Sequence, residues 1–230
     1  MIIITLAFFS CIKKDEIEGE LIMNPKTAEL YIGQSIRFGA NKKNLKWDSK
    51  NKFIGTINKD GLFTANHIGK TKIVASNENA KAEAEVHVIP QITGIPEPVT
   101  KFGEKREKIK ESEKRKLILE SLVALEYETQ SENVETLYYL FGKDDKCIYA
   151  IVRFKDIDEK RLEDLLTFYN ERYEYLGKNK DDYYFTDQRK KTLIALASKE
   201  KITARYTSYD KKKKAQKLSE INDQFDLDLR

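Results

Sequence analysis

Residues of the types that most often do chemistry are few in this chain of 230 residues. Its two cysteines are Cys11 and Cys147 and its two histidines are His67 and His87, without metal-ligand spacing or the pattern of a Cys/His catalytic pair. The sequence contains no glycine-rich phosphate loop and no Gly-x-Ser-x-Gly motif. Pairs of neighbouring carboxylates are expected by chance among its 38 acidic residues, so they do not indicate a glycosidase. The sequence therefore predicts a protein that is not an enzyme, with no catalytic residue, metal site or cofactor.

Cys11 stands where a covalent modification can occur. It follows a run of apolar or small residues that ends at Ser10, and the sequence becomes polar at Lys13. The run is shorter than the roughly 20 residues that a membrane-spanning helix needs, but it suits a secretion signal with a small residue before the cleavage site. The pattern resembles the lipobox of bacterial lipoproteins, which implies cleavage after Ser10 and a lipid on Cys11. The alternative is a buried N-terminal strand in which Cys11 is an ordinary core residue.

Residues 13–16, Lys-Lys-Asp-Glu, resemble the short signal that directs lipoproteins of the Bacteroidetes to the outer face of the outer membrane. The resemblance implies a lipid-anchored outer-membrane protein exposed at the cell surface, with residues 1–10 as signal peptide and residues 11–18 as a tether. Cys147 lies in a strand-like run and is expected to behave as a small apolar residue. The net charge of +4 is not gathered into a sustained basic face, so nucleic acid is not an expected partner.

Residues 19–90 have the pattern of short strands separated by turn residues, which is typical of an all-β sandwich. Apolar and polar residues alternate from residue 82 to residue 88, and this period of two predicts a strand with one buried face. Asp60-Gly61 predicts a tight hairpin turn, and Pro90 is expected to end the last strand.

Five segments of this part resemble the bacterial immunoglobulin-like group 2 domain. In chain order they are Leu30-x-x-Gly33-Gln34-Ser35, residues 47–51, residues 54–65, residues 69–73 and residues 86–90. The resemblance implies a small Ig-like sandwich of the kind found as a spacer in surface adhesins, without catalytic residues. It also implies that Trp47 packs in the core rather than forming a sugar-stacking platform. Gly33, Gly61 and Gly69 are expected at turns that need a positive φ.

Residues 91–101 contain two prolines and predict a linker. Residues 102–209 predict an α+β domain, an antiparallel sheet with one or two helices, and residues 210–230 a charged tail. Residues 117–127 either extend a preceding helix or form a strand. The other predicted elements are a helix within residues 104–116, a hairpin of residues 134–141 and 147–154, a helix capped by Asp156, and strands at residues 183–186, 192–198 and 202–207.

The order of these elements suggests an internal duplication, with one copy near residues 102–154 and the other near residues 156–208. It resembles the small α+β modules of Bacteroidetes lipoproteins and the β-lactamase-inhibitor-like fold. Neither resemblance rests on a specific motif, and neither implies a functional residue. The expected fold class is therefore an all-β Ig-like sandwich followed by an α+β domain.

Eleven of the 12 tyrosines lie beyond residue 91, and tyrosine suits both glycan stacking and protein interfaces. Tyr138 and Tyr149 fall opposite the apolar faces of their predicted strands and are the candidates for an exposed ligand-binding platform. The expected function is a non-catalytic binding or adhesion module for a glycan or for an envelope or host protein, held on the membrane by its lipid, with the Ig-like domain as spacer. The alternatives are a scaffold subunit of an envelope complex and an inhibitor-like module that acts on an extracellular enzyme.

Overall fold

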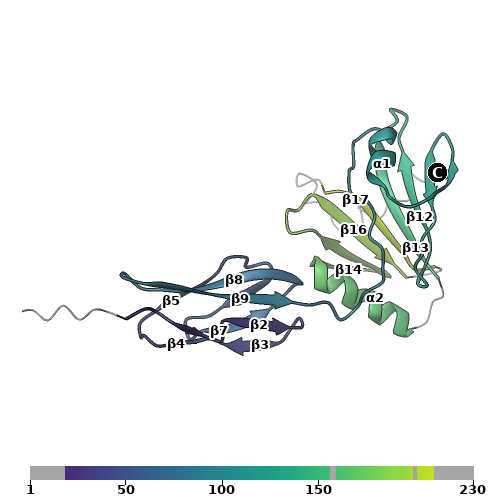
Figure 1. Ribbon diagram of the computed structural model, residues 1–230. Helices are drawn as coiled ribbons and strands as arrows, with labels where there is room; N and C mark the ends of the chain where they lie inside the picture. The colour runs from purple at the N-terminus through teal and green to yellow at the C-terminus, as the bar shows by residue number, and fades with distance from the viewer. Residues whose placement is uncertain (1–18, 156–158, 199–200, 210–230) are drawn as a thin grey trace, which may run out of the picture.

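The computed structural model describes residues 19–155, 159–198 and 201–209 (Figure 1). Two units of β-sheet follow one another along the chain, and the described helices belong to the second unit. The predictions for the signal peptide, Cys11, the tether, the Asp156 helix cap and the tail concern residues outside these ranges. Neither helix of the described part is long and apolar enough to cross a membrane.

The N-terminal unit is built from two main sheets and one small strand pair. The four-stranded sheet has the order β2-β9-β8-β5, the three-stranded sheet has the order β3-β7-β6, and β1 pairs with β4. The strands are β1 (Met23–Asn24), β2 (Thr27–Leu30), β3 (Ser35–Arg37), β4 (Gly39–Ala40), β5 (Lys46–Ser49), β6 (Gly55–Ile57), β7 (Leu62–Ala65), β8 (Gly69–Ser76) and β9 (Lys81–Val88). Side chains from both main sheets form one apolar core, in which Phe63, Ile73 and Val88 are inaccessible to solvent.

The sequence pattern of this unit is reproduced in its local structure. Ala84, Val86 and Val88 are buried along β9, as the alternation predicts, and β9 ends at Val88, before Pro90. Gly61 has a φ of +75° in the turn between β6 and β7, where an added Cβ would lie 2.4 Å from a backbone oxygen. The ring of Trp47 lies beside this glycine and packs against the core, as expected.

The second unit is an eight-stranded antiparallel sheet with two helices. Its strand order is β10-β11-β12-β13-β17-β16-β15-β14. The elements are α1 (Arg106–Ser112), β10 (Leu117–Glu120), β11 (Ala124–Tyr127), β12 (Val134–Phe141), β13 (Cys147–Phe154), α2 (Glu159–Arg172), β14 (Glu174–Asn179), β15 (Asp182–Thr186), β16 (Thr192–Ala197) and β17 (Thr203–Ser208).

This strand order contains the same arrangement twice, which agrees with the predicted duplication. Each half is one helix followed by four antiparallel strands, and the halves meet where β13 pairs with β17, the last strand of each half. The first strand of each half, β10 or β14, is therefore an edge of the sheet. Residues 117–127, left open between helix and strand by the sequence, form the hairpin of β10 and β11.

Both helices cover the same face of the eight-stranded sheet. Ile109 of α1 and Leu165 and Tyr169 of α2 belong to one apolar cluster with side chains of the central strands. Residues 91–101, predicted as a linker, also pack on this cluster, with Ile95 only 8% exposed. The Val99 N–H donates to the hydroxyl of Tyr139 at 2.8 Å. The segment between the two units is thus fixed to the second of them.

The two units also touch directly, at the C-terminal end of α2. The loop between β7 and β8 packs there, and the Ile68 N–H donates to the Glu171 carbonyl oxygen at 2.7 Å. Gln188 Nε2 donates to Asn51 Oδ1 at 3.0 Å beside it. Figure 1 shows α2 on the side of the second unit that faces the N-terminal unit.

Candidate functional site: an apolar hairpin tip

The two predicted site tyrosines of the described part lie on the same face of the sheet but do not form an exposed platform. Their strands pair so that both side chains point to the face opposite the helices. Tyr149 is only 5% exposed, so its predicted exposure is wrong. The reason is that this second face is also apolar, and Tyr149 packs there with Tyr184 and Leu193. Tyr138 is half-buried, with the Arg153 guanidinium 5.3 Å from its ring centre.

The exposed large hydrophobic residues of the described part gather elsewhere, on the hairpin of β10 and β11. Four of the seven such residues are in this hairpin. They are Ile118 at 57%, Leu119 at 50%, Leu122 at 95% and Val123 at 63% exposure. Single exposed apolar residues are common on protein surfaces, but a contiguous group of them marks an interaction site.

The turn of this hairpin carries apolar residues in place of the usual turn-forming residues. Ser121 pairs with Ala124, so Leu122 and Val123 form a two-residue loop. Such loops usually carry Gly, Asn or Asp, because these residues adopt the turn backbone at little cost. We call residues 121–124 the hairpin tip. Neither Leu122 nor Val123 is among the residues with a positive φ, so their backbone does not require such a residue, and what is unfavourable about them is their contact with water.

The second half of the sheet provides an internal comparison. The hairpin of β14 and β15 occupies the equivalent place there, and its two-residue loop is Lys180-Asp181. Lys180 has a φ of +53°, and both loop residues are exposed. The same fold therefore accepts an ordinary polar turn at this place. The apolar residues of the hairpin tip are not needed to form the sheet.

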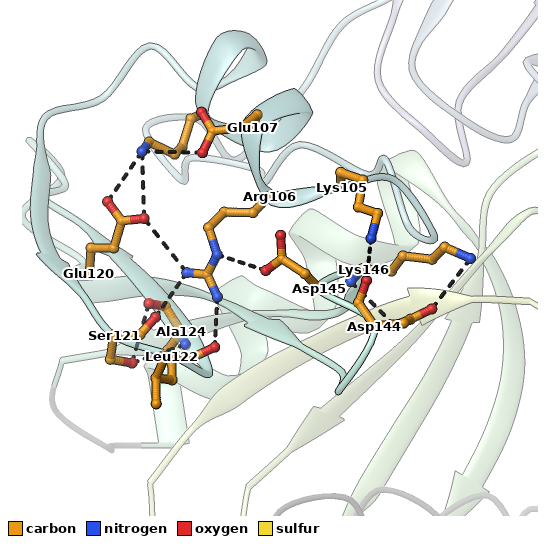
Figure 2. A network of polar contacts seen from close by, with 11 residues as sticks. Lys105, Arg106, Glu107, Glu120, Ser121, Leu122, Ala124, Asp144, Asp145 and Lys146 are labelled. Carbon is orange, nitrogen blue, oxygen red and sulfur yellow. Dashed lines mark hydrogen bonds and ion pairs between the residues drawn. The ribbon is translucent and has the colours of Figure 1, made fainter.

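Arg106 holds the hairpin tip in place (Figure 2). Its side chain extends from the first turn of α1, is 10% exposed, and lies over the Phe141 ring at 4.3 Å. Its Nη1 donates to the Ser121 carbonyl oxygen at 2.9 Å and its Nη2 to the Leu122 carbonyl oxygen at 2.7 Å. The planar guanidinium can make these bonds at once because its five N–H donors have a fixed geometry.

Two carboxylates complete the surroundings of the guanidinium. Asp145 Oδ1 accepts from Arg106 Nε at 2.9 Å, and Glu120 lies 3.9 Å from Nη1. Glu120 also accepts from Lys110 Nζ at 3.2 Å, and this hydrogen bond raises the pKa of the Lys110 ammonium. The charges around the tip are thus paired with one another, while the tip itself carries no charge.

All four carbonyl groups of the hairpin tip have donors within the protein. Those of Ser121 and Leu122 accept from Arg106, that of Val123 accepts from the Phe141 N–H at 2.9 Å, and that of Ala124 accepts from the Ser121 N–H at 2.9 Å. Burying an unpaired carbonyl in an interface costs free energy, whereas burying a paired one costs little. A partner that covers the tip therefore leaves none of these four carbonyl groups without a donor.

A cleft of about 850 Å³, lined mainly by polar and charged residues, lies near the base of the hairpin. Its lining consists of residues 94–96, 112–116, 128, 130 and 131 and contains no aromatic side chain. Glu113 and Arg115 in this lining are bonded to each other, at 2.8 Å. The cleft therefore offers no aromatic face on which a sugar ring could stack, unlike the expected tyrosine platform.

Sequence reasoning did not identify the hairpin tip as a site. The available signal was Leu122-Val123 between two apolar runs, at a place where a hairpin turn would normally be polar. Recognising it required knowing that residues 117–127 form a hairpin and not a helix. The role of Arg106 was hidden for another reason, because its partners lie 14 to 39 residues away in the chain.

Cys147 is expected to be unreactive in the folded protein. It is 1% exposed, and burial raises the pKa of its thiol to about 12. A raised pKa favours the thiol over the nucleophilic thiolate, so a thiol reagent at about pH 8 should label it only on unfolding. The measurement is dithionitrobenzoate labelling of a Cys11→Ser chain, with and without denaturant. Rapid labelling without denaturant would contradict the buried position.

No family model matches the chain, and no curated protein matches it. Among solved structures, the S-layer protein SbsC, domains 5-6, is similar to it at 13% sequence identity, over 83% of this chain and 96% of that chain, with a TM-score of 0.28. A similarity this low carries no argument about fold or function.

Proposed function

We propose that the chain is an exported lipoprotein that binds a protein partner through the hairpin tip, without catalysis. In this proposal Cys11 carries the lipid and anchors the chain in the outer membrane at the cell surface. The N-terminal unit is an Ig-like spacer, and the second unit, an α+β domain, is the recognition domain.

The proposals for the anchor and the spacer rest mainly on sequence. The apolar run before Ser10-Cys11 supports the anchor, and the five motif segments within residues 19–90 support the Ig-like assignment. The strand arrangement is consistent with the latter, because two sheets share one core and β2 runs parallel to β9, so the first main strand pairs with the last.

The observation that carries the binding function is the exposure of Leu122 and Val123 on a turn fixed by Arg106. A fixed apolar projection suits insertion into an apolar pocket of another protein, because little conformational entropy is lost on binding. Aliphatic side chains cannot stack on sugars as aromatic rings do, and Tyr149 is buried. These facts favour a protein partner over a glycan.

A photocrosslinking amino acid placed at Leu122 tests this proposal in cells that produce the protein. We expect a covalent adduct of one defined mass from position 122 and none from position 180, the equivalent exposed loop position. Equal adducts from both positions, or none from position 122, would contradict the proposal. Once the partner is purified, Val123→Asp should weaken its binding at least about tenfold, the effect of losing a central apolar contact.

A further inference from the structure

The contact between the two units contains one of the two histidines of the chain. His67 lies in the loop between β7 and β8, half-buried, with its ring stacked on Phe53 at 3.8 Å. Its Nδ1 is 2.6 Å from the Phe53 carbonyl oxygen, within the N-terminal unit. Its Nε2 is 3.2 Å from the Tyr173 carbonyl oxygen, just after the last residue of α2.

Both neighbours of the ring nitrogens are carbonyl oxygens, which only accept hydrogen bonds. A neutral imidazole has one N–H, so it can satisfy only one of the two oxygens, whereas an imidazolium has two and satisfies both. The shorter distance is at Nδ1, so a single proton belongs there. The Nε2 bond, which joins the two units, therefore requires the second proton.

His67 lies at the C-terminal end of α2. The free carbonyl groups at a helix C-terminus carry partial negative charge. The Glu171 carboxylate is occupied elsewhere, since it accepts from the Gln91 N–H at 2.6 Å and from Arg172 Nη1 at 3.1 Å. The Tyr173 hydroxyl donates to Glu97.

Other charged residues lie on the elements around this contact, among them Asp187 and Arg189, which flank Gln188 in the loop bonded to Asn51. Lys50 and Lys52 flank Asn51 in the loop that also carries Phe53, and Lys70 lies on β8. Lys50 pairs with Asp48 at 3.3 Å. Lysines and tyrosines keep one charge state between about pH 5 and 8, and histidine is the side-chain type that exchanges a proton in this range.

We propose that protonation of His67 fastens the N-terminal unit to the end of α2, so that the joint between the units is firmer in weakly acidic than in alkaline solution. The Ile68 N–H, bonded to the Glu171 carbonyl oxygen next to His67, reports on this joint. This inference does not depend on what the hairpin tip binds.

Amide hydrogen exchange of the full chain, corrected for the intrinsic effect of pH, tests the proposal. We expect Ile68 to be about tenfold better protected at about pH 5.5 than at about pH 8, as for one added charge-assisted hydrogen bond. The Ile73 amide in the core of the N-terminal unit serves as reference and should not follow the change. His87→Gln replaces the other histidine, which is exposed, and should leave the difference unchanged, whereas His67→Gln should abolish it.

Two results would overturn the proposal, namely protection of Ile68 that does not vary with pH and pH dependence that persists in His67→Gln. Nitrogen NMR of the His67 ring gives a second reading in the unaltered protein. It should find both nitrogens protonated in acid and Nδ1 alone protonated in alkaline solution. Retention of the proton on Nε2 in alkaline solution would equally refute it.

Discussion

Replacing Glu171 by alanine is expected to lower the free energy of unfolding of the second unit by about 3–5 kcal/mol, the usual cost of breaking a buried ion pair from one side. The Glu171 carboxylate is completely buried and forms an ion pair with Arg172 at 3.1 Å. It also accepts the N–H groups of Gln91 and Ile92, at 2.6 and 3.4 Å, where the chain enters the second unit. Without it, two backbone donors lose their acceptor, and a largely buried guanidinium keeps only the carbonyl acceptors of Phe168 and Ile92.

The distribution of aromatic residues allows the two units to be followed separately. Trp47 is the single tryptophan and lies in the N-terminal unit, so its fluorescence reports on that unit alone. Eleven tyrosines dominate the near-ultraviolet dichroism of the second unit. In Glu171→Ala the tyrosine transition should shift and the tryptophan transition should not. Glu174→Gln, at an exposed ion pair nearby, is the control and should change stability by less than about 1 kcal/mol. An equally small change in Glu171→Ala would mean that the buried contacts do not contribute.

Replacing Arg106 by alanine is expected to cost about 2–3 kcal/mol of stability and to abolish the crosslinked adduct from position 122. The stability loss is smaller than for Glu171 because Asp145, its ion-pair partner, is half exposed and regains water. We expect binding to be lost because two carbonyl groups of the hairpin tip then lack donors. The tip becomes mobile, and burying its unpaired carbonyl groups under a partner costs more free energy.

The Arg106→Lys variant distinguishes the contribution of the positive charge from that of the planar guanidinium. An ammonium group can pair with Asp145 but cannot donate to two separate carbonyl oxygens from a planar fork. Arg106→Lys should therefore recover part of the stability and little of the adduct. Lys105→Ala, which removes the neighbouring bond from Lys105 Nζ to Asp144, should leave the adduct intact. Adduct formation that survives in Arg106→Ala would show that the tip does not need this support.

The sequence predicted secondary structure best where burial of one face makes apolar and polar residues alternate. β9 was predicted from the alternation of residues 82–88, and the turn before β7 from Asp60-Gly61, because both patterns are local consequences of backbone geometry. β14 was missed. It is an edge strand whose register shifts near Gly177, so neither face presents a regular apolar row. Tyr149 was misjudged because alternation identifies the two faces of a strand but does not reveal whether both are covered.

The candidate site was beyond sequence reasoning for a different physical reason. The hairpin tip is informative only in comparison with the loop of β14 and β15, and that equivalence exists only once the strand order is known. The partners of Arg106 and His67 are likewise brought together by the fold. Their roles follow from the hydrogen-bond donors and acceptors that surround them in the folded protein. The positions of these groups cannot be read from residue spacing along the chain.

The repeat within the eight-stranded sheet allows its two halves to carry different surfaces. The two copies of one arrangement provide two hairpin corners and two helix C-terminal ends. In the described residues the first copy carries the apolar tip, while the second copy supplies the helix end that joins the N-terminal unit. After a duplication each copy is free to lose what the other retains. In the proposed function the two halves therefore have different roles, the first in contact with a partner and the second in attachment to the N-terminal unit.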